Sequence, residues 1–196
     1  MIKNVKEEWE RFLTPSILRS NMIIASVYIA AFEILRNSII ERIREFFSMR
    51  WKEDQNIINP KYESDVLSRN RSTVFASLQW LKYMEAINEM DIVTFSKAKD
   101  VRNKLAHEIP KLLSEGLPPE LPGCLYDIKC LLDKIEKWWI VNVDIPTNPD
   151  FDGMYIDENE IIPGPVANLK MMMDIALGTD EEAEYYIKEF KKQRNF

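Results

Sequence analysis

The chain contains one histidine, His107, which stands five residues after Arg102 and four after Asn103. An imidazole titrates near neutral pH, so it can give or take a proton during a reaction. A guanidinium stays charged and forms planar, two-pronged contacts with phosphate oxygens. These residue types favour proton-transfer chemistry beside a phosphate group, and that chemistry requires no metal ion.

The spacing of these residues sets a geometric constraint. With about 100° per residue on a helix, Asn103 and His107 lie roughly 40° apart and share a face. Arg102 and His107 diverge by roughly 140° and by about 7.5 Å along the axis. Either Arg102 curls around the helix, or a two-fold axis brings a second copy of the segment alongside. Ser96 and Asp100 extend the polar stripe and are candidates for supporting roles, whereas the apolar positions of the helix are expected to face the core: Phe95, Ala98, Val101 and Leu105.

A structural role for His107 is the alternative. A histidine in the last turn of a helix interacts favourably with the partial negative charge at that end. Arg102 would then pair with a carboxylate, and Asn103 would be an ordinary surface residue. The residues by themselves leave both roles open.

Glu33 is a second candidate because it interrupts an apolar helix, where an unpaired carboxylate is costly. It can pair with Arg36 or with Arg102, and in the second case it would orient the Arg102 side chain. Alternatively, it faces solvent beside Arg36 and Asn37.

The composition is that of a soluble globular protein with one domain, or one domain and a terminal extension. The chain has 196 residues, of which 46% are hydrophobic and 30% charged, and only 5 glycines, which favours helices. The longest uncharged apolar stretch, residues 22–32, is shorter than the ~20 residues of a membrane span. No membrane association, signal peptide or cofactor is expected. Cys124 and Cys130, with one histidine, make a metal site improbable and indicate reduced thiols in a cytosolic protein.

Charge is distributed unevenly along the chain. Residues 1–111 carry 18 Lys/Arg and 15 Asp/Glu, whereas residues 112–196 carry 8 Lys/Arg and 17 Asp/Glu. The net negative charge of the chain argues against a general nucleic-acid coat protein. A local basic patch in the first part is possible, but the basic runs, including the one around Lys97, Lys99 and Arg102, are interpreted as solvated helix faces.

Apolar residues recur at three- and four-residue steps, and no strand pattern is convincing. The fold class expected is all-α: an antiparallel helical bundle over residues 1–142, then an acidic loop and two C-terminal helices over 143–196, packed on the same domain. The predicted helices cover residues 5–13, 16–50, 73–88, 91–108 (stopped by Pro110), 124–141, 165–177 and 180–193. Residues 144–164 are expected to be irregular, with a short extended piece at 154–156. Thr179 and Glu182, three residues apart, predict a capping box at the start of the last helix.

The run from Arg102 to His107 resembles the Arg-Asn-x-x-x-His motif of the HEPN superfamily (higher eukaryotes and prokaryotes nucleotide-binding domains). The resemblance covers about residues 16–142 and implies an HEPN-like helical bundle with the motif near the C-terminal end of a late helix. Pro110, three residues after His107, places the motif in that position here. The acidic Glu108 directly after His107 departs from the family pattern.

The resemblance also implies a function. Many HEPN proteins are metal-independent endoribonucleases in toxin–antitoxin or antiviral defence systems, with a composite active site between the two protomers of a homodimer. Arg102 would stabilise the phosphate, His107 would be the acid or base, and Asn103 would position the scissile group. RNA is then the substrate, the setting is cytoplasmic, and an antitoxin or regulatory protein is a possible partner. The alternative is a non-catalytic HEPN-type module that binds a nucleotide, an RNA or a protein.

Overall fold

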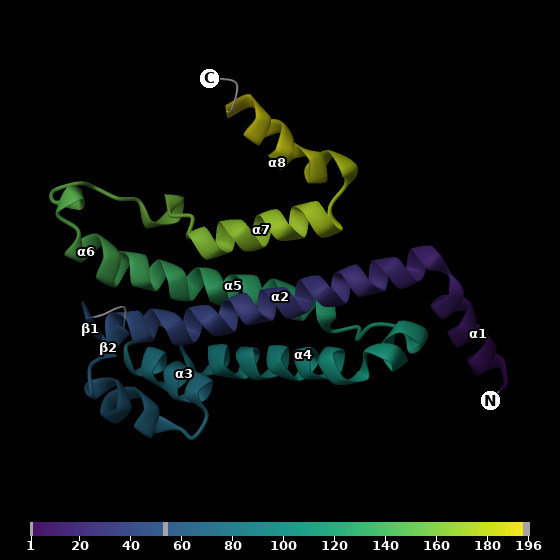
Figure 1. Ribbon diagram of the computed structural model, residues 1–196, viewed down its shortest axis with the longest axis horizontal. Helices are drawn as coiled ribbons and strands as arrows, with labels where there is room; N and C mark the ends of the chain where they lie inside the picture. Colours follow the sequence, from purple (N-terminus) through teal and green to yellow (C-terminus); the bar gives the residue numbers. More distant parts are fainter. Residues whose placement is uncertain (1, 53–54, 194–196) are drawn as a thin grey trace.

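The computed structural model describes residues 2–52 and 55–193. Helices dominate these residues, so the predicted all-α class is confirmed (Figure 1). The helices are α1 (Ile2–Leu13), α2 (Pro15–Phe46), α3 (Thr73–Tyr83), α4 (Glu89–Glu115), α5 (Leu121–Trp139), α6 (Ile145–Thr147), α7 (Gly164–Leu177) and α8 (Asp180–Gln193). Between them lie two strands, β1 (Ser48–Lys52) and β2 (Gln55–Ile58), π-helical turns at Tyr62–Val66 and Ile140–Asp144, and 3₁₀ turns at Leu67–Arg69, Pro149–Phe151 and Glu158–Glu160.

Helix α2 is the central element, since α3, α4, α5 and α7 all contact it. Pro15 occupies its first turn, where the missing N–H has no helical partner to lose. Apolar side chains recur on more than one face, so the helix has to be enclosed by several neighbours. Its buried residues are Ala25, Val27, Tyr28, Ala31, Phe32, Leu35, Ser38, Ile39, Ile40 and Ile43.

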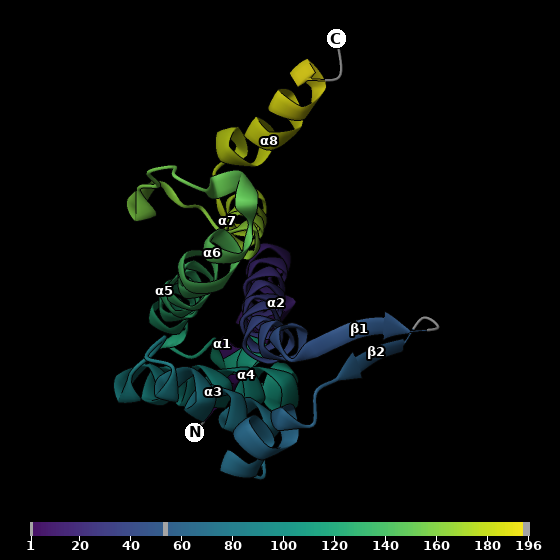
Figure 2. The same cartoon turned by 90° about the vertical axis from the view of Figure 1, so that its left-hand side faces the viewer.

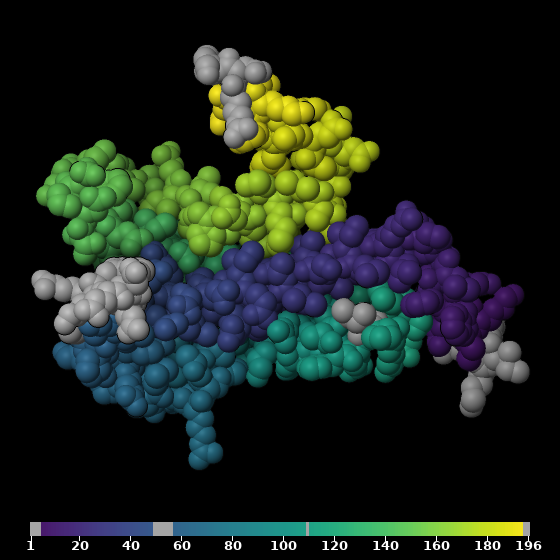
Figure 3. Space-filling view, in the orientation of Figure 1, coloured from purple at the N-terminus to yellow at the C-terminus, as the bar shows by residue number. Residues whose placement is uncertain are grey.

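The long helices lie side by side. The colour gradient in Figure 1 shows that α4 and α7 run opposite to α2 and α5. Figure 2 views these helices nearly end on, with α2 between α4 below and α7 above. The part of the chain after residue 142 joins this arrangement through α7, which packs on α2 and α5. Helix α8 packs against α7 and rises from the main body (Figure 3).

A short hairpin follows α2, where the sequence predicted helix to residue 50 and no strand. The prediction is wrong here: α2 ends at Phe46, and β1 pairs antiparallel with β2. The Asn59 amide donates to the Phe47 carbonyl at 2.8 Å, which closes the base of the hairpin. Ile57 and Ile58 are β-branched and favour strands, but two such short strands leave only a weak pattern in the sequence.

Regular helical geometry breaks at Glu108, where the sequence predicted the helix to end, but α4 then resumes and includes Pro110, so Pro110 does not stop it. A proline inside a helix lacks its N–H, and its ring clashes with the carbonyl four residues earlier. The helix accommodates this with a kink at Glu108, whose φ of −119° and ψ of 17° are not helical, and then resumes to Glu115. Helix α1 packs against α4, and the Arg11 guanidinium donates to the Glu115 carbonyl at 2.7 Å.

Other helix boundaries also differ from the prediction by a few residues. Helix α3 ends at Tyr83 instead of residue 88, because Glu85 has a positive φ of 61°, which no helix interior contains. Helix α5 begins at Leu121 instead of Cys124.

The C-terminal part agrees more closely with the prediction. Residues 144–163 contain only short helical turns and irregular backbone, and no strand forms at 154–156. Helix α7 ends before Gly178, as predicted. The predicted capping box is confirmed at the start of α8: the Thr179 amide donates to Glu182 Oε2 at 2.7 Å, and the Glu182 amide donates to Thr179 Oγ1 at 3.3 Å.

Helix α2 is also long and apolar enough to cross a membrane, judged by length and composition alone. The sequence expectation considered only its uncharged stretch at 22–32, whereas a window of 18 residues within α2 has a mean hydropathy of 1.6. Half of that window is buried inside the structure, as in the core helix of a soluble protein, so the feature is weak evidence for a membrane span.

The enclosure of α2 predicts a large effect of truncating a buried side chain. Leu35 is fully buried, whereas Met22 on the same helix is 52% exposed. We expect Leu35→Ala to lower the free energy of unfolding by about 2–5 kcal/mol, because the lost apolar contacts and the cavity left behind both destabilise the folded state. The control Met22→Ala should change it by less than about 0.5 kcal/mol. Urea denaturation measures both, and equal effects would contradict the packing of α2.

Candidate functional site

Helix α4 carries the motif, and its start and inner face are fixed by specific contacts. The Asp91 amide donates to Asn88 Oδ1 at 3.1 Å, and the Asn88 amide donates to Asp91 Oδ2 at 2.8 Å, which forms a capping box. The Tyr28 hydroxyl of α2 donates to the Ala98 carbonyl at 3.0 Å, and burial raises the pKa of Tyr28. The residues predicted to face inward are all buried: Phe95, Ala98, Val101 and Leu105.

An ion pair joins the motif to α2. Arg102 donates to Glu33 Oε1 from Nε at 3.1 Å and from Nη2 at 2.7 Å. Arg36 Nη1 lies 3.6 Å from the other oxygen of the same carboxylate. The prediction that Glu33 pairs with Arg102 or Arg36 is confirmed, since it pairs with both. The alternative, in which Glu33 simply faces solvent beside Arg36 and Asn37, does not account for its contact with Arg102, although the side chain is one-third exposed.

The ion pair lies in a cavity of about 350 Å³ between α2, α3 and α4. Three cationic side chains and one carboxylate line it, so its charged groups sum to a positive value. Asn103 adds an amide, and apolar side chains form the remaining wall. The lining residues are Phe32, Glu33, Arg36, Val74, Phe95, Lys99, Arg102 and Asn103.

His107 lies about one helical turn beyond Asn103, outside the residues that line the cavity. Its side chain is exposed, and within the described part of the chain it forms no hydrogen bond or ion pair. The kink at Glu108 follows it directly, so His107 is the last residue of the regular part of α4 before the kink. One protomer therefore brings Arg102 and Asn103 together but leaves His107 at the surface.

Two predicted supporting residues take no part in the cavity. The Ser96 hydroxyl donates to the Ile92 carbonyl at 2.9 Å, one turn earlier in the same helix. Asp100 is exposed. Lys104, inside the motif, bonds Glu120 at 3.1 Å, and this hydrogen bond raises the pKa of Lys104. Supporting roles for Ser96 and Asp100 stay predictions without a contact in favour of them.

Sequence reasoning missed Arg36 and Lys99 as members of the site. Lys99 precedes Arg102 by one turn on the same helix face, which was interpreted as a solvated face. Its Nζ lies 5.1 Å from the ring centroid of Phe75, a cation–π contact. The sequence signal for Lys99 is its spacing of three residues from Arg102. Arg36 joins the site only because α4 packs against α2, which the local sequence does not show.

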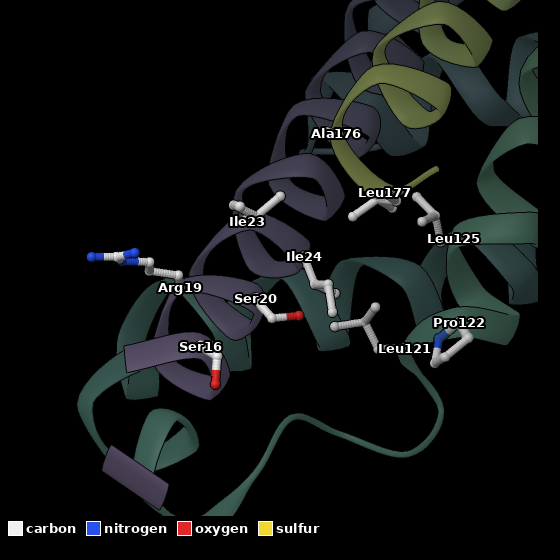
Figure 4. Close-up of a pocket in the computed structure, with 10 residues that line it drawn as sticks. All are labelled: Ser16, Arg19, Ser20, Ile23, Ile24, Leu121, Pro122, Leu125, Ala176 and Leu177. Carbon is white, nitrogen blue, oxygen red and sulfur yellow. The ribbon is translucent and has the colours of Figure 1, made fainter. Parts of the chain in front are cut away.

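A separate cavity of about 490 Å³ lies between α2, α5 and α7 (Figure 4). Its walls are largely apolar, and Figure 4 shows the Arg19 side chain pointing away from it. No motif residue lines it.

Among residues 2–52 and 55–193, no group of three or more His, Cys, Asp or Glu side chains is arranged to hold a metal ion. Both thiols are free, Cys124 buried and Cys130 exposed.

Comparisons of the chain with models of protein families, with curated proteins and with solved structures find no match. Membership of the HEPN superfamily therefore stays a prediction from the motif.

The ion pair predicts an energetic coupling between Glu33 and Arg102. Both side chains are about one-third exposed (33% and 32%), so solvent weakens the pair, and we expect a coupling of about 0.5–1 kcal/mol. A double-mutant cycle with Glu33→Gln and Arg102→Met, followed by urea denaturation, measures it. The pair Glu41 and Arg44, exposed and also in contact, is the control and should couple more weakly. A coupling indistinguishable from zero would contradict the geometry.

Proposed function

We propose that the chain is a metal-independent endoribonuclease of the HEPN type. The observation that carries the proposal is the Glu33–Arg102 ion pair, which holds a guanidinium beside Asn103 in a positively charged cavity one turn from His107. A guanidinium held in this way is positioned before a phosphate arrives, so less side-chain entropy is lost on binding.

The reaction is an attack by the 2′-hydroxyl of RNA on the adjacent phosphorus. A base removes the hydroxyl proton, the bond from the 2′-oxygen to phosphorus forms, and the bond from phosphorus to the 5′-oxygen breaks. An acid then protonates the 5′-oxygen. The products are a cyclic phosphate and a 5′-hydroxyl. His107 serves as acid or base, Arg102 stabilises the charge on the phosphate, and Asn103 positions the scissile group.

A homodimer is part of this proposal, because the reaction needs two proton transfers and each chain has one histidine. His107 is exposed and has no partner among the residues that the structure describes, which is consistent with a residue that completes its site across a two-fold axis. A cytoplasmic setting, a role in microbial defence or in a toxin–antitoxin system, and a regulatory or antitoxin partner also belong to the proposal, by the family resemblance alone.

A second candidate is a non-catalytic module that binds RNA, a nucleotide or a protein. Two observations favour a non-catalytic role: the described residues leave His107 without an orienting partner, and the acidic residues 112–196 repel a polyanion and can instead engage a basic partner. RNA binding that weakens with salt, without turnover, would support this class.

His107→Ala should reduce cleavage at least about 100-fold in the presence of EDTA, because general acid–base catalysis is lost. Arg102→Ala should have a similar effect. The matched control is Arg19→Ala, an exposed arginine of α2 outside the motif, which should retain activity. The measurement is cleavage of a labelled RNA, with DNA of the same sequence as the substrate that lacks the 2′-hydroxyl. An active His107→Ala variant, or cleavage of the DNA, would refute the mechanism.

Mixed subunits test the composite site. Because the proposed site uses His107 of both protomers, wild-type chains dissociated and reassembled with an excess of His107→Ala chains should lose nearly all cleavage, whereas an excess of Arg19→Ala chains should not reduce it. Light scattering should give the mass of a dimer for the wild type and for both variants. Cleavage that an excess of His107→Ala chains does not reduce, together with a monomer mass, would show that any site is complete within one chain.

A further inference from the structure

The cavity beside the motif contains more positive charge than its carboxylate can neutralise. Arg36, Lys99 and Arg102 line it together with Glu33. Glu33 contacts both arginines, whereas Lys99 has no carboxylate partner within residues 2–52 and 55–193; its described contact is the ring of Phe75. An anion in the cavity would complete this charge balance.

Arg102 keeps donors free for such an anion. A guanidinium has five N–H donors, and Glu33 accepts from Nε and Nη2. The hydrogens on Nη1 therefore remain for a ligand. The carboxylate fixes the plane of the guanidinium without occupying all of it, an arrangement suited to a phosphate group.

The cavity is larger than a bare phosphate needs, and it has an apolar wall that a phosphate would not contact. Its volume of about 350 Å³ falls in the range of small-molecule sites, which combine apolar walls with a few polar groups. Phe32, Val74 and Phe95 supply the apolar wall, and the Asn103 amide can both donate and accept a hydrogen bond. These features match one nucleotide: a phosphate on the cations and a base or sugar against the apolar wall.

We propose that Arg36, Lys99 and Arg102 bind the phosphate of a single nucleotide of the RNA substrate, and that this cavity is the subsite next to the bond cleaved near His107. The proposal rests on the proposed function in taking RNA as the substrate. It adds Arg36 and Lys99, which lie outside the motif, as binding residues, and it assigns them no proton transfer.

Calorimetric titration with a nucleoside monophosphate at low salt tests the subsite. Lys99→Met keeps the apolar stem and removes the charge, and we expect it to weaken binding about tenfold, as expected for a lost charged contact to phosphate. Arg36→Met should act in the same direction. The control is Lys97→Met, an exposed lysine on the same helix that does not line the cavity, and it should bind like wild type. Circular dichroism checks that each variant is folded.

A comparison of three ligands tests which chemical groups the cavity binds. The monophosphate should bind at least about tenfold more tightly than the nucleoside and than inorganic phosphate, because only it uses both the cations and the apolar wall. Equal affinity for nucleoside and monophosphate, equal effects of Lys99→Met and Lys97→Met, or no binding by wild type would overturn the subsite.

Failure of the subsite and failure of the proposed function give different results. His107→Ala should abolish cleavage but leave binding of the monophosphate unchanged. If wild type binds the monophosphate through Lys99 and cuts no RNA, the ribonuclease proposal fails while the binding site stands. If wild type cuts RNA and Lys99→Met leaves KM unchanged, the subsite is wrong and the ribonuclease proposal stands.

Discussion

The enclosure of α2 is the constraint on which the rest of the structure depends. This helix has apolar side chains on more than one face, and its burial requires α3, α4, α5 and α7 around it. Burial of apolar surface is the largest favourable contribution to folding. The direction and spacing of every neighbouring helix, including the one that carries the motif, follow from how it packs on α2.

The candidate site lies where a charged residue interrupts the apolar surface of α2. Glu33 is an acidic residue in an otherwise apolar part of α2. Packing of α4 brings Arg102 to this carboxylate, and the pair then holds the guanidinium at the edge of a cavity. A single contact thus links the core of the protein to the residues proposed to bind phosphate, which is why the geometry of the site depends on the packing of α2.

The kink in α4 has a local cause, unlike the packing that forms the cavity, and it determines where His107 lies. Pro110 removes one helical hydrogen bond, and the backbone departs from helical geometry at Glu108. His107 is therefore at the end of a regular helix segment, where its side chain is exposed. The cations of the cavity are held within one chain, whereas the imidazole is presented to whatever approaches the surface, a second protomer or a ligand.

The sequence by itself determined the all-α class, most helix positions, the inward face of α4 and the capping box before α8, because these depend on periodicity and on residues close in the chain. It also indicated the motif and the choice of partners for Glu33. Only the tertiary structure decided that Glu33 contacts both arginines, that Lys99 and Arg36 share a cavity with Arg102, and that α4 passes through Pro110. It also decided that α2 gives way to a hairpin. These features depend on contacts between residues far apart in the chain, or on a balance between local strain and packing, and no local pattern contains them.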